Sequence, residues 1–181
     1  CGTFEENLRN FYAQQTKSNN YQDLKNSFDT LENLRLQQLN NENREDYQTK
    51  HLIEFEVGIS EQKAKEYLSL GIDINEGFKQ YIDDLKTKFG MNTLQMSIHR
   101  DEGYIDKDNV LHHNIHAHFL VHNYNFETKK AILSNFRKKD YRQLQTLAQK
   151  SFNQVGLDFK RGLSKFKTKL KHQKRNDFIL H

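Results

Sequence analysis

The sequence predicts an α+β fold in which helices cover one face of a central antiparallel β-sheet. Segments that alternate apolar and polar residues, as half-buried strands do, are separated by segments whose apolar residues recur every three to five positions, as on one face of a helix. The order helix, strand, helix, hairpin, helix is typical of this class. Thirteen Phe and eight Tyr supply material for a core, although the mean hydropathy is only −0.97.

Length and composition predict one soluble domain over residues 1–181. No apolar run approaches the roughly 20 residues of a membrane span, and the first residues lack a signal-peptide pattern, so we expect a cytoplasmic protein without membrane contact. A single cysteine, Cys1, excludes an internal disulfide framework. A chain that begins with Cys instead of Met also suggests a trimmed segment, truncated at either end.

Charge is distributed unevenly along the chain. Residues 1–100 carry a net charge of about −4 and residues 101–181 one of about +8. This asymmetry predicts a polyanionic partner bound on one side of the molecule.

The first half of the chain predicts two helices on either side of a strand. Residues 21–39 form an amphipathic helix, followed by a polar linker. The strand "HLIEFEV", residues 51–57, alternates, and a helix follows Ser60, which is a suitable N-cap. The apolar positions of the first helix and the strand are Leu24, Phe28, Leu31, Leu34, Leu39, Ile53, Phe55 and Val57.

The second half predicts a helix, a hairpin and a further helix. Asn75 is expected to cap a helix that Gly90 ends. Two alternating strands, "TLQMSIHR" and "NIHAHFLVHN", are joined by a long hairpin connection, "DEGYIDKDNVLHH". A short strand is expected over residues 131–133, and then a helix over residues 139–155 that ends at Gly156.

Alternation in the two hairpin strands separates apolar residues from histidines. In the first strand, Met96 and Ile98 share one face with Leu94, and His99 lies on the other. In the second strand the apolar face consists of Ile115, Ala117, Phe119 and Val121, and the opposite face of His116, His118 and His122.

Two of these histidines have the spacing of metal ligands. Residues two apart on a strand project to the same side about 6 to 7 Å apart, so His116 and His118 can converge on one ion. The antiparallel neighbour brings His99 beside them, and Glu102 is placed to hold the far ring nitrogen of a ligand. His112, His113 and His122 lack such a pattern and are expected to be ordinary polar-face residues, although His122 lines the same face.

A resemblance follows from these residues. "HRDE" and then "HNIHAHF" are similar to the metal-binding signature of HUH endonucleases, and in particular of plasmid mobilisation relaxases of the Mob/Pre type. "SNNYQDL", "NFRKKDYRQLQTLAQKSF" and "GLDFKRG" resemble further segments of that family, so that most of residues 6–175 can be placed. The connection over residues 103–115 is longer than the short link usual in the family.

The resemblance implies an enzyme that nicks one strand of plasmid DNA at a transfer origin and remains attached to the 5′ phosphate. It implies that His99, His116 and His118 bind Mn²⁺ or Mg²⁺, that Glu102 positions a ligand, and that the three-histidine face of the sheet binds DNA. The implied partners are single-stranded or supercoiled plasmid DNA and other mobilisation proteins.

The nucleophile is not evident from the sequence. The family's His-Asn-x-Arg segment matches "ENLR", with Glu6 in place of the histidine and Arg9 in register. Tyr12 and Tyr21 are the candidate nucleophiles, but each also suits a structural role. A missing or altered N-terminal segment, or cleavage without a covalent intermediate, would explain the same departure.

Two other functions share the metal motif. A rolling-circle replication initiator would carry its tyrosine on the helix after the histidine strand, with a lysine three or four residues later; Tyr141 occupies that helix, but Leu144 and Gln145 follow it. Its position near the apolar stripe predicts that Tyr141 packs in the core. A metal-stabilised DNA-binding domain without catalysis is the third hypothesis.

Basic segments near the C-terminus are candidates for DNA contact. The basic residues at the start of the last helix are Arg137, Lys138, Lys139 and Arg142, and those of the following segment include Lys160, Arg161, Lys165, Lys167 and Lys169. Phe159 and Phe166 lie between them and are candidates for stacking on bases. The alternative is a solvated basic helix whose apolar residues face the core.

Overall fold

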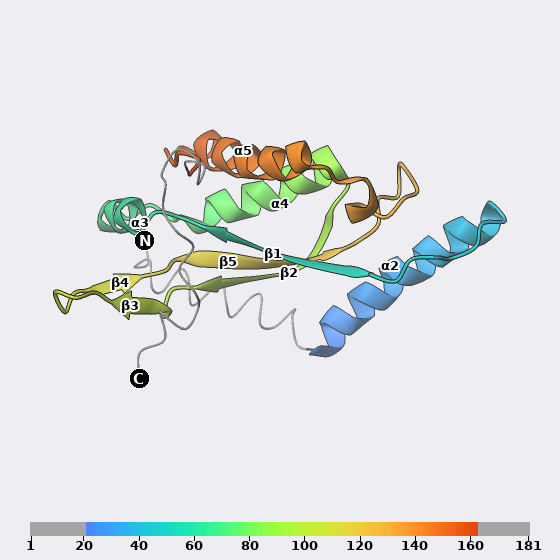
Figure 1. The fold of residues 1–181 in the computed structure, drawn as a ribbon, viewed down its shortest axis with the longest axis horizontal. Helices are drawn as coiled ribbons and strands as arrows, with labels where there is room; N and C mark the ends of the chain where they lie inside the picture. The colour runs from blue at the N-terminus through green and yellow to red at the C-terminus, as the bar shows by residue number, and fades with distance from the viewer. Residues whose placement is uncertain (1–20, 163–181) are drawn as a thin grey trace.

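The computed structural model describes residues 21–162 and arranges them as a small sheet with helices packed on it (Figure 1). The α+β class and the antiparallel sheet predicted from the sequence are confirmed. The elements in chain order are α2 (Tyr21–Asn41), β1 (Leu52–Gly58), α3 (Glu61–Ser69), α4 (Asn75–Phe89), β2 (Asn92–His99), β3 (Gly103–Ile105), β4 (Leu111–His113), β5 (His116–His122), η1 (Leu133–Asn135) and α5 (Lys138–Gln154).

β5 is the middle strand of the three-stranded antiparallel sheet, whose order is β1-β5-β2. Its neighbours are in a register that places His99 of β2 opposite His116, and Glu56 of β1 opposite His118. Ala117 lies between Val57 and Ile98 on the other face. The sequence alternation of all three strands therefore divides the sheet into an apolar face and a face that carries the histidines.

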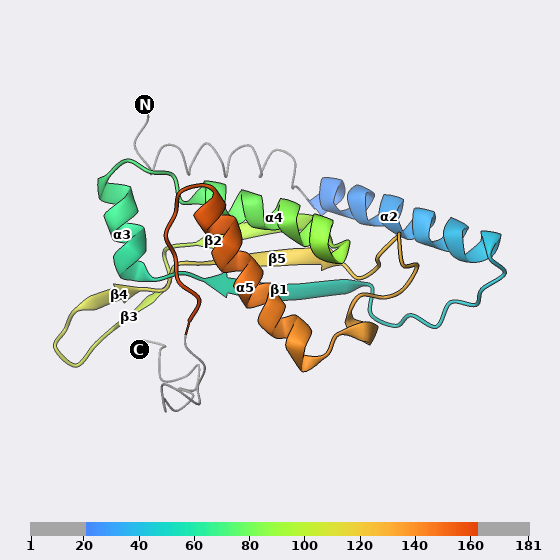
Figure 2. The same ribbon diagram turned by 90° about the horizontal axis from the view of Figure 1, so that it is seen from above.

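The helices α4 and α5 cover the apolar face (Figures 1 and 2). The rings of Phe55 and Phe119 stack with their centroids 5.2 Å apart, and Phe78 of α4 packs against Phe119 at 6.3 Å. Phe152 of α5 reaches Phe78 at 5.0 Å because Gly77 leaves room: a Cβ there would lie 2.3 Å from the Phe152 ring. Aromatic packing thus fixes the two helices on the sheet.

The helix α2 lies on the histidine face instead, at the end of the sheet where β5 finishes (Figure 1). Phe28 of α2 meets the ring of His122 with 6.1 Å between centroids. The expectation that all helices share one face is therefore wrong for α2. The reason is that α2 is held largely by polar contacts, with a buried Arg35 at 2% exposure, and apolar periodicity alone does not reveal such a packing.

The connection between β2 and β5 forms a second, two-stranded sheet, β3-β4, that projects away from the main sheet (Figure 2). Asp106 shapes its turn, since its Oδ1 accepts the backbone N–H groups of Asp108 and Val110. Asn109 takes the left-handed conformation that the turn requires, with φ 63°. The predicted long hairpin connection is thus an ordered hairpin.

Two local predictions are wrong. The short strand expected over residues 131–133 is a 3₁₀ turn, closed by the Asn135 N–H donating to the Ile132 carbonyl. Asn75 does not cap α4 but begins it, and Asp73 accepts the Asn75 N–H in its place. By contrast, Ser60 caps α3 and Gly90 ends α4 in the left-handed conformation, as predicted.

None of the helices within residues 21–162 combines the length and the apolar character that crossing a membrane requires.

Candidate metal centre

Three histidines from two strands meet on the open part of the sheet's polar face. The ring centroids of His99 and His116 are 5.1 Å apart, those of His99 and His118 5.1 Å, and those of His116 and His118 5.0 Å. Alternation along β5 puts His116 and His118 on one side, and the register with β2 adds His99. The fold thus brings together the three residues that the sequence predicts as ligands.

The Nδ1 atoms of His116 and His118 each have a hydrogen-bonding partner. Nδ1 of His116 donates to the Asn114 carbonyl at 2.8 Å, and Nδ1 of His118 lies 3.1 Å from Oε1 of Glu54. Such bonds fix the tautomer and leave Nε2 with its lone pair free for a ligand role. Both rings are therefore oriented as metal-binding histidines are.

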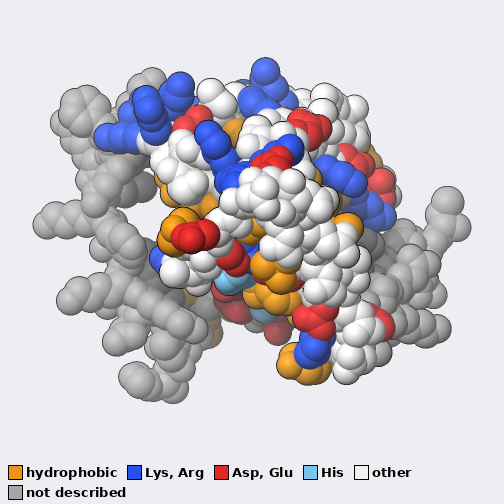
Figure 3. Space-filling view, turned by 90° about the vertical axis from the view of Figure 1, so that its right-hand side faces the viewer, with side chains coloured by type: hydrophobic (Ala, Val, Ile, Leu, Met, Phe, Trp, Pro, Cys, Tyr) orange, Lys and Arg blue, Asp and Glu red, His pale blue; other side chains and the backbone are white. Residues whose placement is uncertain are grey.

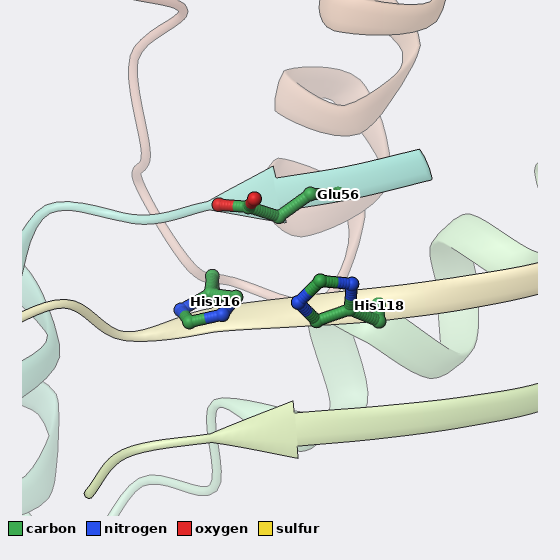
Figure 4. Close-up of side chains that lie close together, drawn as sticks. All are labelled: Glu56, His116 and His118. Carbon is green, nitrogen blue, oxygen red and sulfur yellow. The ribbon is translucent and has the colours of Figure 1, made fainter. Parts of the chain in front are cut away.

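Carboxylates extend the centre on both sides of His116. Glu56, His116 and His118 offer ligand atoms that lie within 4.8 Å of one another, and so do His99, Glu102 and His116. Figure 4 shows Glu56 on β1 and the two imidazoles on β5, projecting from the same face. His116 belongs to both groups, so either group, or the three rings with one carboxylate, could hold a metal ion.

Glu102 lies beside two of the three histidine rings. Its carboxylate lies 3.3 Å from Nδ1 of His99 and 3.8 Å from Nε2 of His116. Glu102 can therefore hold Nδ1 of His99, the outer role expected from the sequence, or act as a ligand itself beside Nε2 of His116. The outer positions on His116 and His118 are occupied by the Asn114 carbonyl and by Glu54.

Sequence reasoning missed Glu54 and Glu56. Both alternate with Phe55 and Val57, which correctly puts them on the polar face of β1. Their proximity to the histidines depends on the pairing of β1 with β5, which joins residues about 60 positions apart, and no local pattern encodes that register.

Exposure differs among the three ligand candidates. His116 is buried, at 2% exposure, whereas the side chains of His99 and His118 are about one third exposed, at 37% and 35%. The buried ring of His116 is held within the protein, and the partly exposed rings of His99 and His118 border solvent. An exchangeable ligand can reach the centre from the solvent side.

The root of the β3-β4 hairpin is fastened beside the centre. Glu61 accepts the backbone N–H of His113 at 2.9 Å; this bond and the Lys65 ion pair lower the pKa of Glu61 to about 2. The Asn114 N–H donates to the Glu102 carbonyl at 2.9 Å. These contacts hold the chain on both sides of the hairpin, and with it the position of Glu102.

His112 and His113 lie outside the centre. His112 contacts Asp106 at 2.9 Å and Glu61 at 3.4 Å, and the hydrogen bond with Asp106 raises its pKa above the ordinary value. Nδ1 of His113 lies 3.2 Å from the Arg100 carbonyl. Both rings take part in fastening the hairpin.

His122 lies on the same face of β5 but within an ion-pair network from α2. Its Nε2 is 2.6 Å from Glu32, which also contacts His51 at 2.9 Å and Arg35 at 2.9 Å. Burial lowers the pKa of His122, so the ring is neutral and donates to the Glu32 carboxylate. With Nε2 committed in this way, His122 is a packing residue.

The predicted nucleophiles are only partly within the described chain. Arg9 and Tyr12, as well as Glu6, lie outside residues 21–162. Tyr21 begins α2 and is 77% exposed; no hydrogen bond or ring contact joins it to the three histidines within the described residues.

The predicted DNA contacts are at the surface where they are described. Arg137, Lys138, Lys139 and Arg161 are exposed, while Lys165, Lys167, Lys169 and Phe166 lie outside the described residues. Phe159 does not stack on a ligand, because it is buried at 7% and packs on Phe152 and Tyr67. Tyr141, expected to pack in the core, is 52% exposed.

The end of the molecule that carries α2 shows how the charges are arranged (Figure 3). Lys and Arg side chains gather mainly toward the helix layer, and histidine and acidic side chains appear together lower down. Acidic side chains also lie among the basic ones in the upper part of this view.

No protein-family model, curated protein or solved structure matches the chain. The histidine centre is therefore the main structural indication of function.

Proposed function

We propose that this protein is a metal-dependent DNA strand-nicking and strand-transfer enzyme of the relaxase type, acting on plasmid DNA at a transfer origin. The observation that carries the proposal is the set of three imidazole rings of His99, His116 and His118, each about 5 Å from the other two. The resemblance of "HRDE" and "HNIHAHF" to the Mob/Pre signature supports it.

The donor set fits a divalent transition metal. Imidazole nitrogens suit ions such as Mn²⁺, whereas Mg²⁺ prefers oxygen ligands, so we favour Mn²⁺ over Mg²⁺. Glu56 or Glu102 would add one oxygen to the three nitrogens. When bound, a divalent ion polarises the scissile phosphate and offsets the charge that develops on its oxygens.

The protein's own residues prepare this reaction. Asn114 and Glu54 hold the rings of His116 and His118 so that their Nε2 atoms share one face. In the proposed step, a tyrosine oxygen, having lost its proton to a base, forms a bond to phosphorus as the bond to the 3′ oxygen breaks. The 5′ phosphate then remains on the protein, and the 3′ oxygen takes up a proton.

Tyr12 is our first candidate for that nucleophile and Tyr21 the second, with Arg9 as a phosphate contact. We further propose one domain over residues 1–181, a cytoplasmic location, and other mobilisation proteins as partners.

The position of Tyr141 favours a relaxase over a replication initiator. Tyr141 belongs to α5, which packs on the apolar face of the sheet, while His116 and His118 project from the other face (Figure 1). An initiator needs its tyrosine beside the metal. Because Tyr141 lies in the helix layer, on the opposite side of the sheet from the histidines, it is poorly placed to be an initiator's nucleophile.

Incubation of the protein with a supercoiled plasmid that carries its transfer origin, in the presence of Mn²⁺, tests the proposal. We expect relaxed circles with protein on the 5′ end, and no nicking by the His116→Ala or His118→Ala variants. His51→Ala is the matched control, because His51 lies outside the centre and contacts Glu32 of α2. Intact plasmid with the wild-type full-length chain would refute the enzyme and leave a non-catalytic DNA-binding domain; an adduct at Tyr141 would favour the initiator.

A further inference from the structure

A groove runs along the free edge of β1, between this strand and α5, on the helix side of the molecule. Its volume is about 890 Å³. β1 is an edge strand within the described sheet, where β5 is its one strand neighbour. Figure 2 shows α5 crossing over β1 at this place. The groove is separate from the three histidines, although Glu56 lines it.

The walls of the groove are basic. Two stretches of sequence about 20 residues apart, at the start of α5 and after its end, contribute one pair of cations each: Lys138 with Arg142, and Lys160 with Arg161. Within residues 21–162, Glu56 is the one carboxylate that lines it. All four cations are exposed. The guanidinium of Arg161 donates a hydrogen bond to the Thr146 hydroxyl at 3.0 Å, which orients its side chain. Charge complementarity therefore calls for a polyanion.

The floor of the groove is apolar and aromatic. Phe55, Leu144 and Ala148 line it as half-buried side chains, and Tyr81 and Phe152 lie beneath them at 1% exposure. Tyr141 stands at the side, 52% exposed, with its ring edge against Phe136 at 5.5 Å. A half-exposed aromatic ring beside cations is the arrangement on which unpaired bases stack.

The edge of β1 adds hydrogen-bonding groups. Ile59 donates its N–H to Ile115 of the β5 side at 3.0 Å, and the His51 carbonyl accepts from Asn123 at 2.8 Å. The backbone N–H and C=O groups of the odd-numbered residues of β1 therefore point toward β5. Those of Glu54, Glu56 and Gly58 point away from β5, toward the groove. Such N–H groups can donate to phosphate oxygens, and the N–H and C=O groups together can bind base edges.

We infer that this groove binds a stretch of single-stranded DNA that flanks the cleavage site and leads it around the edge of β1 toward the histidine face. The inference rests on the proposed nicking function. Single strands are favoured over duplex because only unpaired bases present free faces to Tyr141 and the apolar floor. Four cations against one acid favour DNA over an extended peptide, which would otherwise suit an open strand edge.

Fluorescence anisotropy with a labelled oligothymidylate and the full-length protein, in EDTA, tests the groove independently of the metal. We expect Arg142→Glu and Lys160→Glu each to weaken binding about 10-fold and to reduce the salt dependence of affinity. Lys150→Glu is the matched control, because Lys150 is an exposed cation of α5 outside the groove and the change in net charge is the same. Tyr141→Phe should bind like wild type and Tyr141→Ala more weakly.

Circular dichroism confirms that each variant is folded before its binding is compared. If Arg142→Glu binds no more weakly than Lys150→Glu, the inference is wrong, whether or not the protein nicks plasmid. If Arg142→Glu loses affinity relative to Lys150→Glu while the wild type does not nick plasmid with Mn²⁺, the groove binds single-stranded DNA, and the proposed nicking function is wrong. A photo-crosslinker at position 141 that labels a peptide partner but not the oligonucleotide would also overturn the inference.

Discussion

The two ends of β5 carry histidines on the same face of the strand, but the histidines at the two ends have different surroundings. At one end, His116 and His118 turn their Nε2 atoms toward a shared opening, with Glu54 and Asn114 holding the far nitrogens. At the other end, His122 is fully buried and its Nε2 is bound to Glu32. Residue type, strand and side-chain direction are equal at both ends, so none of them decides the role.

What differs is the element that covers each end. α2 lies over His122 and supplies a carboxylate, and Arg35 secures that carboxylate through hydrogen bonds to Glu32 and Asp46. At the open end, the neighbouring strands bring His99 and Glu56 beside the rings. His122 is thus a packing residue because a helix covers it and a carboxylate of that helix binds its Nε2. His116 and His118 are candidate ligands because further ligand groups lie beside them.

Arg35→Ala should have the largest effect on this comparison, at the closed end. The guanidinium is 2% exposed and bonds both Glu32 and Asp46, so its removal takes the arginine from a partly buried carboxylate that keeps two histidine contacts. We expect a loss of about 3 kcal/mol in the free energy of unfolding, measured by urea denaturation. Arg44→Ala, at an exposed arginine, is the control and should cost less than about 1 kcal/mol. Equal losses would show that the network does not hold α2.

Glu54→Ala probes the open end. Glu54 holds Nδ1 of His118, and removing such an outer partner lowers metal affinity about 10-fold. Isothermal titration with Mn²⁺ measures this, with the exposed Glu127→Ala as the control. An unchanged Kd for Glu54→Ala would mean that His118 is not oriented by this contact.

His122 should make stability pH-dependent. Burial lowers its pKa below the ordinary 6.5, so as the pH falls below about 6.5 the unfolded chain takes up a proton before the folded chain does. The free energy of unfolding should drop from pH 6.5 to 5.5 relative to His122→Gln, by at most about 1 kcal/mol. Subtracting the variant removes the contribution of His112, which both chains share. Parallel pH profiles would contradict the assigned state of His122.

Lys25→Ala should have the smallest effect. Lys25 pairs with Asp29 one turn further along α2, and both side chains are nearly half exposed. Exposed pairs of this kind contribute little because water screens them. The urea midpoint should match the wild type, and a clear shift would show that α2 depends on surface pairs as well as on Arg35.

Periodic patterns in the sequence predicted the elements around the centre well. Alternation placed His99, His116 and His118 on one face of adjacent strands, because side-chain direction in a strand depends only on local geometry. The predicted bounds of α5 also differ from the observed Lys138–Gln154 by one residue at each end.

Contacts between distant parts of the chain could not be predicted in this way. Glu32 reaches His122 across 90 positions, and Glu54 reaches His118 across 64. These contacts depend on which face α2 occupies and on which strand pairs with β5. The position of α2, the proximity of Glu56 to the histidines and the presence of Lys138 and Arg161 in one groove are visible only in the fold.

Binding of Mn²⁺ to His116→Ala and His122→Gln, measured side by side with the wild type by isothermal titration at pH 7.5, tests the division of β5 most directly. The wild type and His122→Gln should each bind one ion with similar affinity, and His116→Ala should show no saturable binding. Undiminished binding by His116→Ala, or loss of binding in a folded His122→Gln, would contradict the assignment of the metal centre to His99, His116 and His118.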